Sequence, residues 1–515
     1  MTISGTVSFE RPSINTATDG LNYNTVQTLP VREAVLEAVD GAGMAIVTSR
    51  TDENGNYSVT VPAGQDVRIR VLSRTTQGPG DAATWNVAVT DNTSGNAVYA
   101  IQGALADSGA ANSTRDLVAG LGDFNGTQYT TTRASGPFAV LDSSYKAVQT
   151  VVDVDPDVVL PPIEMRWSVN NRSVSGDPAT GAIGTSSYQT RTVGGVRDAA
   201  VFILGDENSD TDEFDESVVV HEWGHYFEDQ MSRSDSIGGS HSLNSLLDPR
   251  VALGEGFGNA LSAIVLGNPI YRDSFGAQQA NGFNFSLEAQ PTTNPGWFKE
   301  FSVQSILFDI ADDGADTDDT LSEGFAPIYN AMVDPAYIDL QAFTTVYSMM
   351  ESIRRNTPSI AAGVDQLLAR ENIVGTGNLG AGETNEGGVA GVLPVYLQPV
   401  IGGPAVEFCS VDEAGTFNRL GNRQYLQFTI DARETLNFRM ELAPGGGASG
   451  SDPDFLILQN RFILGSGRSA DPDAEVASIT LDAGTYNIDA YAAVNVGDND
   501  AIPPGSFCYQ FSISR

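Results

Sequence analysis

The chain has 515 residues, with 65 Asp and Glu against 27 Lys and Arg, and a formal net charge of -38. This acidic balance argues against nucleic acid and against an anionic membrane surface as partners, because both require positive charge. No apolar run approaches the length of a membrane-spanning helix, so we expect no membrane insertion. The length predicts about three domains, and the 54 glycines favour loop-rich or β-rich parts.

Residues 1–105 are predicted to form an all-β domain. Strand-like segments lie at Ile3–Phe9, Ala42–Ser49, Tyr57–Val61 and Val67–Leu72. Between them, Asn54-Gly55 is a strong signal for a hairpin turn. The pattern resembles the transthyretin-like or carboxypeptidase-regulatory-like β-sandwich modules of secreted peptidases. No catalytic constellation is found in this part, and a spacer or folding role is favoured over substrate binding.

Helix and strand signals follow one another after residue 105. The small and polar stretch Ala104–Gly126 is interpreted as a linker, and the apolar spacing of Pro137–Val154 predicts a helix. The short apolar run Ala199–Leu204 is bounded by charge and glycine, which predicts a buried strand.

An acidic stretch follows the predicted strand. Asp206, Asp210 and Asp212 alternate with other residues in the manner of a calcium-binding loop, and Asp312 and Asp316 invite the same interpretation further on. The first stretch is no EF-hand, because a threonine stands where the loop needs glycine. Solvated surface acids, or negative charge favoured at the start of a helix, are the alternatives.

Residues 218–228 contain the pattern that indicates a catalytic function. His221-Glu222-Trp223-Gly224-His225 is an H-E-x-x-H sequence within a helix-like stretch. Residues four apart share one face of a helix, so His221 and His225 can present imidazole nitrogens to one zinc ion. Glu222 stands beside the first ligand, where it can take a proton from a water at the metal. A chance match is the alternative, but two of the three histidines of the chain stand here.

A second helix-like segment supplies a further carboxylate. Glu255 stands at the head of this run, and a catalytic zinc ion needs three protein ligands and one open position. His221, His225 and Glu255 would make that set. The third histidine, His241, lies between the two segments. It is a candidate hydrogen-bond donor to an oxyanion or a substrate contact, with a surface histidine as the alternative.

H-E-x-x-H followed by Gly254-Glu255-Gly256 resembles the gluzincin metallopeptidases, with the thermolysin and fungalysin branches as the nearest likenesses. The resemblance covers roughly Asp206–Met332. It implies an α+β zincin domain, which we place at residues 106–400, and it makes Glu255 the third zinc ligand. Asn259 stands where these families usually have an aspartate that orients a ligand histidine. An amide can accept the imidazole N–H, but it brings no charge. Related enzymes often use a tyrosine at the oxyanion, and Tyr329 is the candidate, with core packing as its alternative.

Residues 401–515 are predicted to be β structure again. Leu481–Tyr491 resembles the recurring strand of the pre-peptidase C-terminal domain, a small jelly roll. The two cysteines, Cys409 and Cys508, lie near the two ends of this module, whose first and last strands would be neighbours. A disulfide is favoured over two buried free thiols, and it implies an oxidising compartment.

The expected protein is multidomain: an α+β zincin catalytic domain flanked by two β-sandwich or jelly-roll domains. It is expected to bind one zinc ion, with calcium at the acidic stretches as a candidate beside solvated surface acids, and to act on protein or peptide substrates as a monomeric endopeptidase. Met1 leads directly into a strand-like segment without a signal peptide pattern, and a mature secreted form is favoured over a cytosolic one. The alternatives are a zinc hydrolase of another amide or glycoprotein substrate, and a β-rich binding protein with an inactive zincin core.

Overall fold

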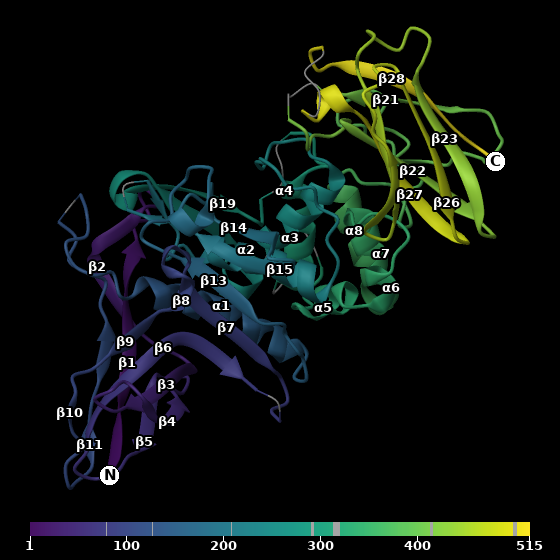
Figure 1. The fold of residues 1–515 in the computed structure, drawn as a ribbon. Coiled ribbons are helices and arrows are strands. Elements are labelled where there is room, and N and C mark those ends of the chain that lie inside the picture. Colours follow the sequence, from purple (N-terminus) through teal and green to yellow (C-terminus); the bar gives the residue numbers. More distant parts are fainter. Residues whose placement is uncertain are drawn as a thin grey trace. The chain divides into compact units, whose positions relative to one another are not determined.

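The computed structural model describes the chain except residues 79, 126, 208, 290–292, 313–319, 413–415 and 498–501. The chain divides into two compact units (Figure 1). Unit 1 comprises Met1–Gln230 and Leu261–Ser286, and unit 2 comprises Met231–Ala260 and Leu287–Arg515. Strands account for 37% of the structure and helices for 23%. Among the described residues, no helix is both long and apolar enough to cross a membrane.

The predicted fold class, an α+β zincin domain flanked by two β-domains, is wrong. The chain is mostly β, and strands from both sides of residue 105 join in one ten-stranded sheet of unit 1. The helix signals around the two sequence motifs correspond to real helices, but these are a minority beside the sheets. The domain boundaries near residues 105 and 400 stay a prediction.

The smaller sheet of unit 1 is built around one long strand, β1 (Thr2–Ile14). β1 pairs antiparallel with β2 (Leu21–Pro30) and β5 (Asn56–Thr60), and parallel with β11 (Ser113–Thr114) and β12 (Leu117–Ala119). The predicted turn at Asn54-Gly55 is present, and Gly55 has a φ of 75°. A Cβ atom at Gly55 would lie 2.4 Å from the Val7 carbonyl oxygen, so only glycine fits there. The turn joins strands of two different sheets and forms no hairpin.

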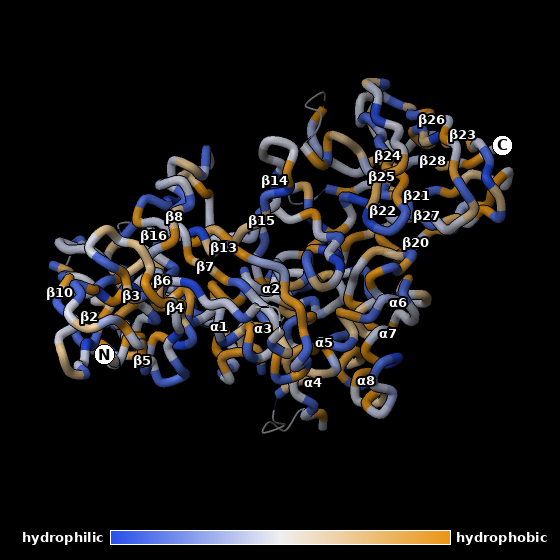
Figure 2. Tube along the Cα trace, turned by 60° about the horizontal axis from the view of Figure 1, so that its bottom comes forward, coloured by the Kyte–Doolittle hydropathy of each residue, from blue (hydrophilic) through white to orange (hydrophobic). Residues whose placement is uncertain are grey.

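The ten-stranded sheet of unit 1 has the order β14-β15-β13-β7-β6-β3-β4 along its main path. β13 pairs parallel with both β7 and β15, whereas β14 pairs antiparallel with β15. The strands are β3 (Ala34–Val39), β4 (Ala45–Arg50), β6 (Asp66–Gln77), β7 (Trp85–Asp91), β13 (Ile163–Trp167), β14 (Ser187–Val193) and β15 (Val196–Ile203), with short β8 (Ala97–Val98), β9 (Ala100–Gln102) and β10 (Ala106–Asp107) beside them. Helix α1 (Gly136–Val154) packs on β6 and β7, whose buried faces carry hydrophobic residues (Figure 2).

The strand predicted at Ala199–Leu204 is confirmed as β15, but it is an inner strand of the sheet. β14 covers its outer side and ends the sheet among the described residues. The remaining elements of unit 1 are the helix α2 (Glu216–Met231), the hairpins β16 (Gly205–Asp206) with β17 (Asp210–Thr211) and β18 (Ile270–Phe275) with β19 (Asn281–Ser286), and the 3₁₀ turns η1 (Asn92–Ser94), η2 (Pro178–Thr180) and η3 (Ala277–Gln279).

Unit 2 begins with helices. Helix α3 (Pro249–Leu266) contributes its first part to unit 2 and its last residues to unit 1. Helices α4, α5, α7 and α8 pack against one another and bury their apolar faces. The bounds are α4 (Glu300–Ala311), α5 (Ala326–Met332), α6 (Pro335–Ile338), α7 (Val346–Asn356), η4 (Pro358–Ile360) and α8 (Ala361–Arg370).

The last part of unit 2 is a two-layer β-sandwich. One sheet has the order β20-β22-β27-β24-β25 and the other β21-β28-β23-β26. Their inner faces share one core, in which Phe428 and Ile488 of the first sheet lie with Phe438 and Phe511 of the second. The bounds are β20 (Tyr396–Leu397), β21 (Val406–Val411), β22 (Arg423–Ile430), β23 (Glu434–Leu442), β24 (Pro453–Gln459), β25 (Phe462–Gly467), β26 (Ala474–Leu481), β27 (Gly484–Ala492), η5 (Ala493–Asn495) and β28 (Ser506–Ser514).

The predicted disulfide is confirmed. Cys409 and Cys508 face each other across the antiparallel pair β21 and β28, and they are joined. The bond closes a loop with a sequence separation of 99 residues. A cross-link over so long a loop restricts the unfolded chain strongly.

Replacing both Cys409 and Cys508 by alanine should destabilise the sandwich by about 2–5 kcal/mol, because the unfolded chain regains the entropy that the cross-link removes. Differential scanning calorimetry of the full chain should show one transition moving to lower temperature. Reduction of the wild-type protein should reproduce the shift. Coinciding transitions of variant and wild type would show that the bond contributes nothing to the folded sandwich.

Glu371, at the end of α8, should make unit 2 less stable as the pH rises. The side chain is buried, and burial raises its pKa from 4.5 to about 7, although Arg370 and Lys299 act in the opposite direction. The folded protein therefore keeps a proton that the unfolded chain loses, and stability falls between about pH 4.5 and pH 7.

The variant Glu371→Gln should consequently be more stable than wild type by up to about 3 kcal/mol above pH 7, with no gain at pH 4. Urea unfolding at both pH values measures this difference. Glu351→Gln, on the exposed side of α7, is the matched control and should change little. Equal effects of the two substitutions would contradict the assignment to Glu371.

Candidate metal centre

Helix α2 begins at an acidic residue that is paired with two basic side chains. Glu216, in its first turn, lies 2.6 Å from an Arg11 guanidinium nitrogen and also pairs with Lys146. Burial alone would raise the pKa of Glu216, but Arg11 and Lys146 lower it to about 2. The carboxylate stays charged at the positive end of the helix dipole, which favours this starting point of the helix. The three valines at positions 218–220, in the next turn, are buried.

The two histidines of α2 converge as their spacing predicts. The Nε2 atoms of His221 and His225 are 3.1 Å apart. His225 Nδ1 lies 3.0 Å from a carboxylate oxygen of Glu228, one turn further along the helix. A neutral imidazole that donates from Nδ1 to this carboxylate presents a lone pair at Nε2. This tautomer is the one that a metal ligand needs.

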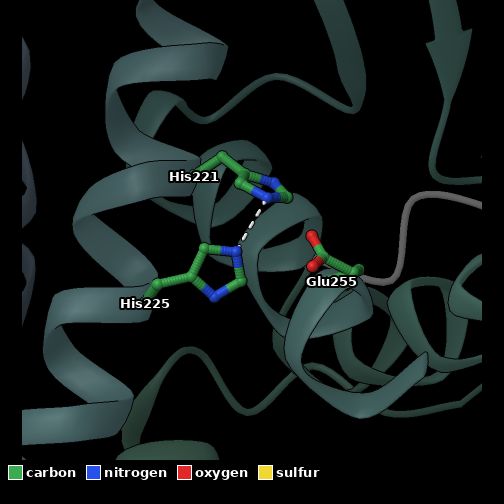
Figure 3. A group of neighbouring side chains, drawn as sticks. All are labelled: His221, His225 and Glu255. Carbon is green, nitrogen blue, oxygen red and sulfur yellow. Dashed lines mark hydrogen bonds between the residues drawn. The ribbon is translucent and has the colours of Figure 1, made fainter. Parts of the chain in front are cut away.

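Glu255 completes a group with the two histidines. One ligand atom from each of His221, His225 and Glu255 lies within 4.8 Å of the others, and Figure 3 shows the carboxylate directed toward both imidazoles. Glu255 stands inside helix α3, not at its head as predicted. At the neighbouring Gly256 a Cβ atom would lie 2.6 Å from the Val303 Cβ. The glycine after Glu255 therefore allows α3 and α4 to approach closely.

The donor set fits a zinc ion. Two imidazole nitrogens and one carboxylate are the ligands of many catalytic zinc sites, which leave a fourth position open. Two nitrogens bound to one tetrahedral zinc ion at about 2.0–2.1 Å are about 3.3 Å apart, close to the separation of the two histidines. All three side chains are mostly buried, so water competes little with a ligand there.

Glu222 is held in place from the edge of the ten-stranded sheet. The backbone N–H of Tyr188, in β14, donates to a Glu222 carboxylate oxygen at 2.8 Å. The Tyr188 hydroxyl donates to Asp229, so the same residue contacts α2 at two points. The carboxylate and the outer edge of β14 are thereby placed side by side.

His241 lies between two carboxylates of unit 2. Its Nε2 is 3.2 Å from Glu255, and its Nδ1 is 2.7 Å from Glu300, the buried first residue of α4. These contacts connect His241 to the proposed third ligand. The oxyanion or substrate role of His241 stays a prediction.

Two further residues from the sequence analysis occupy defined places. The Asn259 amide nitrogen donates to Gln304 at 2.8 Å, within the contact of α3 and α4. Its predicted role toward a ligand histidine stays a prediction. Tyr329 is 4% exposed in α5, with its ring centre 6.2 Å from that of Phe325. Its proposed role at an oxyanion likewise stays a prediction.

Of the described residues predicted to bind calcium, the structure brings only two together. Asp210 and Asp212 group with Asp273, which the sequence analysis did not select. Asp206 lies opposite Asp210 in the β16–β17 pair, outside that group of three. Asp312 follows the last turn of α4, and Asp316 lies outside the described residues.

Two residues that contact the histidines of α2 were not predicted from the sequence. Glu228 contacts His225, and its i+3 spacing was a signal that could have identified it. Tyr271 of β18 has its ring centre 6.2 Å from that of His221 and stacks on Phe285 at 4.8 Å. No local pattern predicts this contact, because β18 lies beyond α3 in the chain.

Comparisons with known proteins give little. No family model and no curated protein matches the chain. Among solved structures, the pre-peptidase C-terminal domain of a Bacillus anthracis collagenase covers 23% of this chain and 93% of its own, with 10% identity and a TM-score of 0.17. The copper-binding surface protein CorA of Methylomicrobium album BG8 covers 23% of this chain and 96% of its own, with 8% identity and a TM-score of 0.18. The lysozyme inhibitor PliG of Aeromonas hydrophila covers 23% and 95%, with 11% identity and a TM-score of 0.15. Likenesses this weak carry no functional argument.

Removing the Glu255 carboxylate should weaken zinc binding. We expect Glu255→Ala to lower the zinc affinity by more than about 100-fold, since even partners outside the ligand shell contribute about 10–100-fold. Competition with a chromogenic chelator measures the affinity, and Glu351→Gln serves as the control. Unchanged affinity would remove Glu255 from the ligand set.

Proposed function

We propose that this chain is a secreted zinc-dependent peptidase. The observation that carries the proposal is the convergence of His221, His225 and Glu255, with Glu222 next to the first histidine on the same helix. The resemblance of these motifs to the gluzincin metallopeptidases supports the same conclusion. This resemblance concerns only the proposed ligands and the proposed base.

The side chains have separable roles in this proposal. His221, His225 and Glu255 hold the zinc ion, and Glu228 fixes the tautomer and the ring orientation of His225. A zinc ion held there lowers the pKa of a water molecule and polarises the scissile carbonyl. Glu222 accepts the proton of the attacking water and passes it to the departing amine. The Tyr188 N–H keeps the Glu222 carboxylate in position.

A peptide fits this arrangement better than a compact small molecule. β14 ends its sheet, and its backbone groups alternate between β15 and the outer edge. Because the Tyr188 N–H points outward to Glu222, the backbone of Thr190 faces the same outer edge. An extended peptide that pairs with this edge would lie beside the base, with affinity from main-chain hydrogen bonds and limited sequence preference.

The disulfide supports the proposal that the protein is secreted. The disulfide between Cys409 and Cys508 is of the kind that persists outside the cytosol. Both cysteines of the chain are used in it.

The variant Glu222→Gln should keep its zinc and lose its activity, because an amide cannot accept the proton of the attacking water. We expect a rate loss of about 10²–10⁴-fold. Digestion of a peptide library followed by mass spectrometry measures the cleavage, and metal analysis of the same sample measures the zinc.

Three results would count against the proposal or part of it. Full activity in Glu222→Gln would reject the base assignment. A zinc-loaded wild-type protein that cleaves no peptide, but hydrolyses another amide or a glycoprotein, would keep the metal centre and replace the substrate class. A protein that binds no zinc would favour the alternative of a β-rich binding protein without catalytic activity.

A further inference from the structure

Unit 1 contains a second cluster of potential ligands. Asp210 lies in β17, Asp212 follows that strand directly, and Asp273 lies in the middle of β18. One carboxylate oxygen from each lies within 4.8 Å of the others. These residues come from two hairpins that are separated in the chain by α2 and α3. The cluster plays no part in the proposed peptidase chemistry.

Three buried oxygens of the cluster, one from each aspartate, have no hydrogen-bond donor within the described residues. Asp212 is 3% exposed; its Oδ2 accepts from the Ser186 hydroxyl, but its Oδ1 is buried and makes no hydrogen bond within the described part of the chain. The same holds for one buried oxygen of Asp210 and one of Asp273. Buried polar atoms normally have partners, so three such oxygens in one place indicate a missing ligand.

Within the described residues, burial and neighbouring acids act on these carboxyl groups, and no lysine or arginine is among the groups that shift their pKa. Burial raises the pKa of Asp212 well above its usual range, and the neighbouring Asp273, Asp210 and Asp215 raise it further. Burial, and then Asp210, raise the pKa of Asp273 to about 7. Arg11 acts on Asp215, but its guanidinium already pairs with Glu216.

We infer that Asp210, Asp212 and Asp273 form a binding site for a divalent cation, with calcium as the preferred ion. Calcium takes oxygen ligands at about 2.3–2.6 Å, so two oxygens on opposite sides of one ion are about 5 Å apart. The three carboxylate oxygens here lie within 4.8 Å of one another, so one ion can contact all of them. Magnesium is smaller and keeps several waters in strict octahedral geometry, which a buried set of carboxylates suits less well.

The site would connect the two hairpins to the start of α2. Asp215 accepts hydrogen bonds from the backbone N–H and the hydroxyl of Ser274, the residue after Asp273. The Asp215 carbonyl oxygen in turn accepts the Val219 N–H, an early hydrogen bond of α2. An ion that joins β17 to β18 therefore stiffens the approach to the helix that carries His221.

Isothermal titration calorimetry with calcium chloride tests the inference. The full chain carrying Glu222→Gln avoids self-cleavage and serves as the parent protein, freed of calcium on a chelating resin. Asp212→Asn and Asp273→Asn are introduced into it separately. Asp206→Asn is the matched control, because it lies in the same acidic stretch but outside the cluster.

We expect the parent to bind calcium more tightly than magnesium. Each of the two cluster variants should lose at least about 30-fold in calcium affinity, and the control should stay within about threefold of the parent, since ligand charge sets calcium affinity. Calcium should raise the unfolding temperature of the parent and the control only. Without calcium, the cluster variants should unfold no earlier than the parent, because they relieve repulsion, and this separates lost binding from failed folding.

The following results would overturn the inference. In the first, the parent protein binds no calcium, which would mean that the three carboxyl groups share protons instead of an ion. The cluster variants bind calcium like the parent, which places the ion elsewhere, for example at Asp452, Asp454 and Glu475 of the sandwich. Asp206→Asn weakens binding as much as Asp273→Asn, which returns the site to the linear acidic stretch.

Discussion

Compensation of buried carboxylates is the interaction on which the region around α2 depends. Glu216 is neutralised by Arg11 and Lys146, and the fully buried Glu213 lies 2.6 Å from Arg133. With 65 acidic and 27 basic residues, the chain cannot supply an arginine or a lysine for every acid. A buried carboxylate without such a partner has to accept hydrogen bonds from neutral donors, take up a proton or bind a metal ion. In unit 1, one buried oxygen of each of Asp210, Asp212 and Asp273 has no hydrogen-bond partner within the described residues.

The grouping of the candidate ligands could be predicted in part, because most of it is local. His221 and His225 are four residues apart on one helix, and helical geometry alone brings their nitrogens together. Glu255 is different: it lies on another helix, and it was selected from the need for a third ligand and from the resemblance to a known motif, not from local geometry. The position of Glu222 beside the edge of β14 could not be predicted, because it depends on a hydrogen bond between distant segments.

The sheet topology could not be predicted for the same reason. Strand-like segments identified β1, β5 and β6, a short apolar run identified β15, and apolar spacing identified α1. Periodicity does not say which strand pairs with which. The parallel pairing of β7 with β13 unites segments that composition had assigned to separate domains, and it made the predicted fold class wrong. The linear spacing of acidic residues similarly selected Asp206, whereas the folded chain supplies Asp273 from another hairpin.

The disulfide of the sandwich has a consequence for damage to the chain. Cys409 and Cys508 lie on adjacent strands, β21 and β28, and every other strand of that sheet lies between them in sequence. A single cut in the backbone between the two cysteines therefore releases no fragment, since both pieces stay linked through sulfur. The cut strands also remain in the sheet beside their neighbours. A nicked molecule would migrate as two bands only after reduction, and it would keep its shared core until then.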